Sequence, residues 1–263
     1  MNAKEYIKHL LSIENYSFSL GEITQETAGS RNSLKFELHR LSEKGEIVNL
    51  RKGFYLIITP RYSKAKKLPI QLYCEKLFKY LNRNYYIGLF SAARLYGASH
   101  QQTQRDYLIT EKPKLNDISK NTIDIRFFTT TNWSHKNIRQ MKSDAGVFNV
   151  SSPALTIVDL IHYQTKIGGI NRILTTIEEL AEELKELDIS ELLSWYPNKS
   201  ALQRFGFLLE KLGMHKDFQE MIFSELAAKK FFPVLLSPKS KEKPGAVHNR
   251  WKVYANVTLE SDL

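Results

Sequence analysis

The chain has 263 residues, 42% of them hydrophobic, and carries 38 Lys and Arg against 28 Asp and Glu, which gives a formal net charge of +10. This length exceeds that of one small DNA-binding module, so we expect two domains, and the positive charge favours a polyanionic partner. Cys74 is the only cysteine, which excludes an intramolecular disulfide and a cysteine-based zinc cluster within one chain. We also expect a soluble, cytoplasmic protein, because the N-terminus lacks the apolar core of a signal peptide and no uncharged run reaches about 18 residues.

One segment of the N-terminal region has a clear helical pattern. Leu34, Leu38 and Leu41 follow the spacing i, i+4, i+7, so they form one apolar stripe on a helix that packs on a small core. Ser30 is a suitable N-cap, and Gly45 stands where a left-handed residue usually ends a helix. The sequence therefore predicts a helix with both of its ends.

The neighbouring stretches place this helix in a winged helix-turn-helix. Residues 21–27 are long enough for a short first helix, and residues 28–29 supply a tight turn. Two β-prone runs, 46–50 and 54–58, flank the sequence Arg-Lys-Gly at 51–53, which predicts a hairpin. Helix, turn, helix and hairpin is the order of a winged helix, so DNA is the first partner to test.

The face of the predicted helix opposite the leucines is polar and basic. Asparagine can read adenine in the major groove, and arginine or lysine can read guanine or bind phosphate. The predicted DNA-binding residues lie on this helix and at the hairpin tip: Ser30, Arg31, Asn32, Lys35, His39, Arg51 and Lys52. The alternative interpretation is an ordinary solvated helix face.

Phe36 is a large apolar residue on the same face. Either it packs against the N-terminal helix, through Ile7, Leu10 and Leu11, or it contacts a thymine methyl group in DNA. The sequence leaves both alternatives open.

Residues 61–69 (RYSKAKKLP) are interpreted as a linker, because they are basic, lack apolar periodicity and end in proline. The predicted domains are a winged helix-turn-helix with its basic linker at 1–68 and a C-terminal domain at 69–263. The linker lysines, which are Lys64, Lys66 and Lys67, either make secondary contacts to the DNA backbone or stay solvated.

The second domain has a mixed pattern. Three runs are β-prone, at 107–110, 123–129 and 147–150, and helices are predicted from Ser152-Pro153 through Tyr163 and over 170–187. The predicted fold class is therefore α+β, with an N-terminal winged helix followed by a larger mixed α/β domain.

Three charged stretches of the second domain have open interpretations. Lys136, Arg139 and Lys142 recur at i, i+3 and i+6 of a predicted helix. They either make secondary contacts to the DNA backbone or form a solvated helix face. Residues 178–191 carry seven acidic residues and one Lys, which indicates a solvated helix face or contact with a basic partner. Residues 229–252 carry seven Lys and Arg against one Glu and could bind nucleic acid. At the end of this tail, Trp251, Val253 and Tyr254 alternate as in a strand that returns to the fold.

Enzymatic alternatives have weak support. Phosphate-loop, zincin and hydrolase-elbow motifs do not occur in the sequence. Asp159 and His162 could pair on one helix face, as metal ligands or, as we favour, as a buried hydrogen-bonded pair. Three carboxylates in β-prone segments leave open a DNA-binding effector with a divergent magnesium-dependent nuclease domain: Asp106, Glu111 and Asp124. A ligand-sensing winged-helix repressor is a further alternative, and we predict no catalytic residues, metal or cofactor.

The order of several short motifs resembles the AbiEi family of type IV antitoxins. These motifs are KGFY at 52–55, YIGL at 86–89 with SAA at 91–93, VSSP at 150–153 with LTIVDL at 155–160, and GG at 168–169. Each motif alone has low specificity, but together they span about residues 20 to 215 in the expected order.

The resemblance implies an antitoxin of a phage-defence (abortive infection) system. Its winged helix would repress its own operon by binding inverted repeats in the promoter, and its C-terminal domain would counteract a nucleotidyltransferase-like toxin without a stable complex. We expect a monomer in solution that assembles on DNA, because a single winged helix reads only a short half-site.

Overall fold

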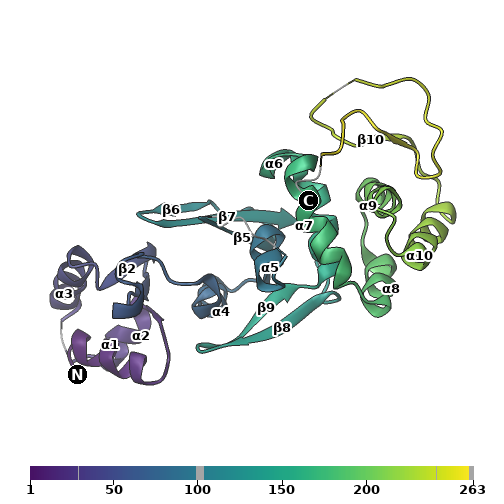
Figure 1. The fold of residues 1–263 in the computed structure, drawn as a ribbon. Helices are drawn as coiled ribbons and strands as arrows, with labels where there is room; N and C mark the ends of the chain where they lie inside the picture. Colours follow the sequence, from purple (N-terminus) through teal and green to yellow (C-terminus); the bar gives the residue numbers. More distant parts are fainter. Residues whose placement is uncertain (29, 99–103, 241, 261–263) are drawn as a thin grey trace. The chain divides into compact units, whose positions relative to one another are not determined.

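The computed structural model describes residues 1–28, 30–98, 104–240 and 242–260, and over these residues the fold is mixed α+β, as predicted. The chain, shown as a ribbon in Figure 1, divides into two compact units. The first contains residues 1–86, 104–130 and 140–149, and the second contains the remaining described residues. The predicted domain boundary after residue 68 stays a prediction.

The N-terminal segment of the first unit consists of three helices and three short strands. They are α1 (Ala3–Ser12), β1 (Ser17–Ser19), α2 (Leu20–Glu26), α3 (Arg31–Glu43), β2 (Ile47–Arg51) and β3 (Phe54–Ile57). The strands form an antiparallel sheet in the order β1-β3-β2. Helix α3 has the predicted ends, because the Ser30 hydroxyl accepts a hydrogen bond from the Ser33 backbone N–H and Gly45 has a φ of 70°. Gly29 of the predicted turn lies outside the described residues.

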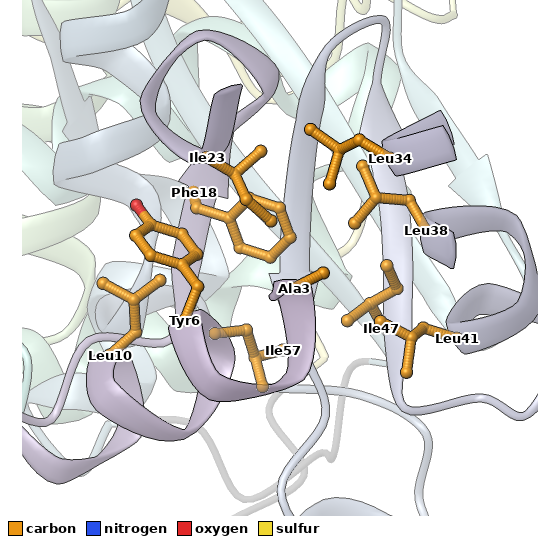
Figure 2. Packing of buried hydrophobic residues seen from close by; sticks show 10 residues of the cluster. All are labelled: Ala3, Tyr6, Leu10, Phe18, Ile23, Leu34, Leu38, Leu41, Ile47 and Ile57. Carbon is orange, nitrogen blue, oxygen red and sulfur yellow. The ribbon is translucent and has the colours of Figure 1, made fainter. Parts of the chain in front are cut away.

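This segment has its own hydrophobic core (Figure 2). The three leucines of α3 are at most 4% exposed and pack with residues of α1, α2 and the sheet. The cluster consists of Ala3, Tyr6, Leu10, Phe18, Ile23, Leu34, Leu38, Leu41, Ile47 and Ile57. The predicted leucine stripe is thus the core-facing side of α3, which leaves its opposite side in solvent.

The stretch predicted as a linker contains packed residues. Leu68 is fully buried, and the Lys67 ammonium lies 2.9 Å from the carboxylate of Asp106, which is also buried. The chain continues through two turns of 3-10 helix and one α-helix: η1 (Pro60–Tyr62), η2 (Ile70–Leu72) and α4 (Cys74–Leu81). The basic composition of this stretch therefore does not mean that all of it is solvated.

A six-stranded sheet has the order β6-β7-β5-β4-β9-β8. Its strands are β4 (Tyr85–Ile87), β5 (Arg105–Glu111), β6 (Ile118–Lys120), β7 (Ile123–Thr130), β8 (Ile138–Ser143) and β9 (Gly146–Ser151). Strands β5 and β7 are parallel, with Arg105 opposite Asp124, and β6 is antiparallel to β7. The three β-prone runs predicted from the sequence lie within β5, β7 and β9.

The second unit is mainly helical. Its elements are α5 (Leu89–Leu95), α6 (Pro153–Ile167), α7 (Ile170–Glu182), α8 (Glu186–Trp195), α9 (Lys199–Lys211), α10 (Lys216–Ala227) and the parallel pair β10 (Val234–Leu235) and β11 (Val253–Tyr254). In Figure 1, α5 is blue, α6 to α9 are green and β10 is yellow. Helix α6 begins as predicted, because the Ser152 hydroxyl accepts from the Leu155 backbone N–H and Pro153 occupies the first turn.

The C-terminal stretch packs on α9 through Trp251. The indole is fully buried, and its Nε1–H donates to Glu210 over 2.7 Å. A Cβ atom at Gly206 would lie 2.1 Å from the indole ring, so only glycine allows this packing. The predicted return of the basic tail as a strand is confirmed by β11.

One predicted helix of the second domain is wrong, and another ends earlier than predicted. The residues around Lys136, Arg139 and Lys142 form strand β8 instead, preceded by Asn137 in a left-handed conformation with a φ of 60°. Residues 170–187 form α7 only as far as Glu182, and α8 begins separately at Glu186. In the first case residues 138–143 lie beside β9 in the six-stranded sheet, and the helix-like spacing of the three cations does not show this strand pairing.

No helix among the described residues is long and apolar enough to cross a membrane.

Candidate nucleic-acid interface

Helix α3 presents its polar side to solvent. The side chains of Arg31, Asn32, Lys35 and His39 are exposed, as the sequence predicted, whereas the leucine stripe is buried. Cations and an amide on one exposed helix face are suited to phosphate and base-edge contacts. Because the core fixes the opposite face of α3, these side chains are presented together without any rearrangement.

Two of the predicted residues on this helix already have partners. The Ser30 hydroxyl accepts the hydrogen bond from Ser33 N–H, so its first role is to cap the helix. The His39 Nδ1 lies 3.6 Å from the Glu43 carboxylate one turn later. Glu43 would therefore offset part of the charge that a protonated His39 brings to a phosphate.

The two basic residues of the hairpin differ in their surroundings. The Arg51 guanidinium donates to the backbone carbonyl of Asn116 and lies 5.1 Å from the centre of the Phe127 ring. Burial, together with the neighbouring Arg83, lowers the pKa of Arg51. Lys52 is exposed, and only its backbone carbonyl is engaged, by the Tyr80 hydroxyl at 2.9 Å.

The turn between β2 and β3 requires its glycine. Gly53 has a φ of 77°, and a Cβ atom there would lie 2.8 Å from the Tyr80 hydroxyl. A second contact holds strand β2, which leads into this turn: the Lys120 ammonium donates to the backbone carbonyl of Asn49 over 2.6 Å. The hairpin is thus fixed on one side, while the Lys52 side chain extends into solvent.

The secondary cations are not equivalent. Lys64, Lys66 and Lys142 are exposed, which keeps them compatible with backbone contacts. Lys67 is paired with Asp106, the Lys136 ammonium donates to the Ser194 hydroxyl over 3.0 Å, and the Arg139 guanidinium is bound to Asp188. The last three residues would have to exchange a protein partner for a phosphate.

Phe36 does not pack against α1, so that alternative is wrong. Its side chain is 75% exposed, whereas Leu10 of α1 belongs to the core cluster and Ile7 and Leu11 pack against it. At about 100° per residue, Phe36 points roughly 170° away from the leucine stripe, and hence away from α1's apolar side.

Sequence reasoning missed that Lys4 and Lys44 lie beside Phe36, together with Arg40. A surface pocket of about 350 Å³ is lined by Phe36 together with Lys4, Arg40 and Lys44, and also by Ser33, Glu37 and Leu41. The spacing of Phe36 and Arg40, one helical turn apart, was a signal for one of these residues. Lys4 comes from another helix, so its proximity could not be read from local spacing.

Asp159 and His162 do not form the buried pair that was favoured. Asp159 is buried, and the Tyr196 hydroxyl lies 3.5 Å from its carboxylate. The His162 side chain instead contacts the Asn198 amide. Although the two residues lie on adjacent turns of α6, Asp159 contacts Tyr196 and His162 contacts Asn198.

The three carboxylates considered for a nuclease are each bound by the protein. Asp106 pairs with Lys67, Asp124 accepts from Arg105 over 2.7 Å, and Glu111 accepts from the backbone N–H of Asn84 over 3.2 Å. Among the described residues, no group of three or more His, Cys, Asp or Glu side chains is placed to hold a metal ion.

The ligand-sensing alternative required a compact apolar pocket. The first unit contains a pocket of about 520 Å³, but Glu14, Glu75, Lys76 and Lys79 are among its lining residues. Charged walls of both signs do not suit an apolar effector.

Comparison with known proteins gives a direct match for the central part of the chain. A search of curated proteins returns no match. Residues 86–211 match the family model described as AbiEi antitoxin C-terminal domain, and the match covers β4 through α9, including the VSSP motif that begins α6. This match supports an antitoxin role in a toxin–antitoxin system. Over residues 86–211 the chain is thus similar to the C-terminal domain of AbiEi antitoxins, as its motifs indicated.

Proposed function

We propose that residues 1–58 form a winged helix that binds double-stranded DNA, with α3 in the major groove. Arg31, Asn32 and Lys35 would lie nearest the bases, and Lys52 would reach the adjacent phosphate backbone. The observation that carries this proposal is the division of α3 into a buried leucine face and an exposed basic face. The net charge of +10 agrees with a polyanionic partner.

The biological role proposed for this binding is autorepression. The chain would bind inverted repeats in its own promoter as a monomer that assembles on the DNA, since one winged helix reads too short a site for strong specificity. As the antitoxin of a type IV system, it would also counteract a nucleotidyltransferase-like toxin without forming a stable complex with it.

DNA binding is tested with a labelled duplex that contains the sequence directly upstream of the protein's own coding region. We expect binding that prefers this duplex over a scrambled one and weakens steeply with salt. Lys35→Ala should weaken it. Lys211→Ala in α9 is the matched control, because it removes the same charge from an exposed position far along the chain. Equal affinity of all three proteins for both duplexes would contradict the proposal.

The antitoxin role is tested by co-expression with the product of the reading frame directly downstream, which we expect to be a nucleotidyltransferase-like toxin. The full-length protein should restore growth, and so should the double variant Arg31→Ala, Lys35→Ala, although the latter no longer represses its promoter. If the double variant also fails to restore growth while it is folded and expressed, the two activities are not separate.

A further inference from the structure

Phe36 is an apolar side chain at the centre of a charged surface. At 75%, it has the greatest exposure of the large hydrophobic residues that the structure describes. Exposure of an aromatic side chain to water is unfavourable. The other two phenylalanines of the N-terminal segment, Phe18 and Phe54, are buried in the core, whereas Phe36 makes no contribution to core packing. Phe36 is therefore accessible to a partner outside the chain.

The geometry of α3 places Phe36 opposite the core. Its side chain points roughly 170° from the centre of the leucine stripe, so it projects outward more directly than Arg31 or Lys35 on the flanks. Asn32 and Arg40 lie one turn before and one turn after it on the same face.

The surroundings of Phe36 indicate the chemistry of that partner. The pocket beside it is lined by Lys4, Arg40 and Lys44 against the single acid Glu37, so the apolar ring lies among positive charges. An apolar protein partner would favour a wider hydrophobic patch than one ring. In the DNA major groove, by contrast, one small apolar group, the thymine C5-methyl, lies between rows of phosphates.

We propose that Phe36 contacts the C5-methyl group of a thymine in the bound duplex and thereby makes that position of the binding site prefer thymine. This assignment rests on the proposed DNA binding by α3. It adds an apolar reading contact to the polar contacts of Arg31, Asn32 and Lys35.

The probe is a duplex selected by the wild-type protein from a randomised library, resynthesised with uracil in place of each thymine in turn. Uracil pairs like thymine but lacks the methyl group. We expect the wild-type protein to lose about fourfold in affinity at one or two positions, which is the effect of one lost buried methyl group. Phe36→Ala should bind the thymine duplex about as weakly as the wild type binds the uracil duplex, and should not distinguish the two.

The control is Ile13→Ala, which truncates another exposed apolar residue of the same unit, at 59% exposure. It should keep the full preference for thymine. Phe36 is exposed, so its variant should keep the circular dichroism and melting temperature of the wild type. If the wild type binds the duplex but tolerates uracil at every position, or if Phe36→Ala still discriminates, the Phe36 assignment is overturned alone. If the wild type selects no duplex from the library, the DNA-binding proposal fails as well.

Discussion

The Arg51 guanidinium, at the end of β2, donates a hydrogen bond to the backbone carbonyl of Asn116, 65 residues later in the chain. The same guanidinium lies over the Phe127 ring of β7. Strand β2 and the β6–β7 hairpin are therefore tied together within the first unit. Arg51, which the sequence predicted to bind DNA, therefore has partners within the protein, whereas the side chain of its neighbour Lys52 is exposed.

The two hairpin cations should accordingly give different variants. Arg51→Ala should lower the free energy of unfolding by about 1–3 kcal/mol, because a hydrogen bond from a charged donor is lost. Lys52→Ala should change stability by less than about 0.5 kcal/mol but reduce the slope of log affinity against log salt by about 1, because one phosphate contact disappears. Urea unfolding and salt titrations of DNA binding measure the two effects. If Arg51→Ala instead reduced the slope of log affinity against log salt and left the stability unchanged, Arg51 would be a DNA-contacting residue.

Arg31→Ala should affect sequence preference. Arg31 is exposed at the first turn of α3, where side chains of a recognition helix reach base edges. Loss of a bidentate contact to guanine should cost about 1–3 kcal/mol of discrimination and reduce binding to the preferred duplex more than to a scrambled one. Competition binding with both duplexes provides the measurement, and Lys52→Ala is the comparison. Equal losses on the two duplexes would mean that Arg31 contacts only phosphate.

Local rules were sufficient for the N-terminal segment. The leucine spacing, the Ser30 cap and the positive φ of Gly45 are all properties of residues close in sequence, so α3 and its ends followed directly from them. The exposure of Phe36 did not follow, because it depends on where α1 lies, and that is set by contacts across the small core.

Packing between elements explains the errors in the second domain. Residues 138–143 form a strand beside β9, and the spacing of the three cations does not encode this strand pairing. The break between α7 and α8 likewise leaves Leu187 70% exposed, although it was the last residue of the helix predicted over 170–187. Strand order in the six-stranded sheet also depends on contacts between distant segments, so a single sequence could not supply it.

Stability should fall in alkaline solution. Burial raises the pKa of the Cys74 thiol to about 12, and burial also raises the pKa of Tyr73. In the unfolded chain the thiol loses its proton near pH 8.5, so above that pH the unfolded state binds fewer protons and is favoured. The contribution is complete below about pH 8.5 and is lost as the pH approaches 12.

The size of this effect is about 1.4 kcal/mol per pH unit for one retained proton, or about 3 kcal/mol between pH 9 and 11 from the thiol alone. Denaturant unfolding at several pH values measures it. Cys74→Ala removes the thiol, so its stability should fall less steeply over the same range. Identical slopes for the two proteins would show that the thiol titrates in the folded state as it does in the unfolded chain.

Gly206→Ala should destabilise the second unit, although alanine favours helices. In an open helix position the change from glycine would stabilise by about 0.5–1 kcal/mol. At Gly206 the added methyl group would lie 2.1 Å from the Trp251 indole, so α9 and the C-terminal stretch must separate or distort, at a cost of about 1–3 kcal/mol. Urea or thermal unfolding should show the loss.

Gly21→Ala in α2 is the matched control, since a Cβ atom there meets only the Ser19 hydroxyl oxygen at 3.7 Å, and its stability should be unchanged or higher. A second variant tests the cause directly. Trp251→Leu removes the ring that the methyl group would meet, so adding Gly206→Ala to it should cost at least about 0.5 kcal/mol less than in the wild-type protein. Additive effects of the two changes would mean that Gly206 and Trp251 do not pack against each other in solution.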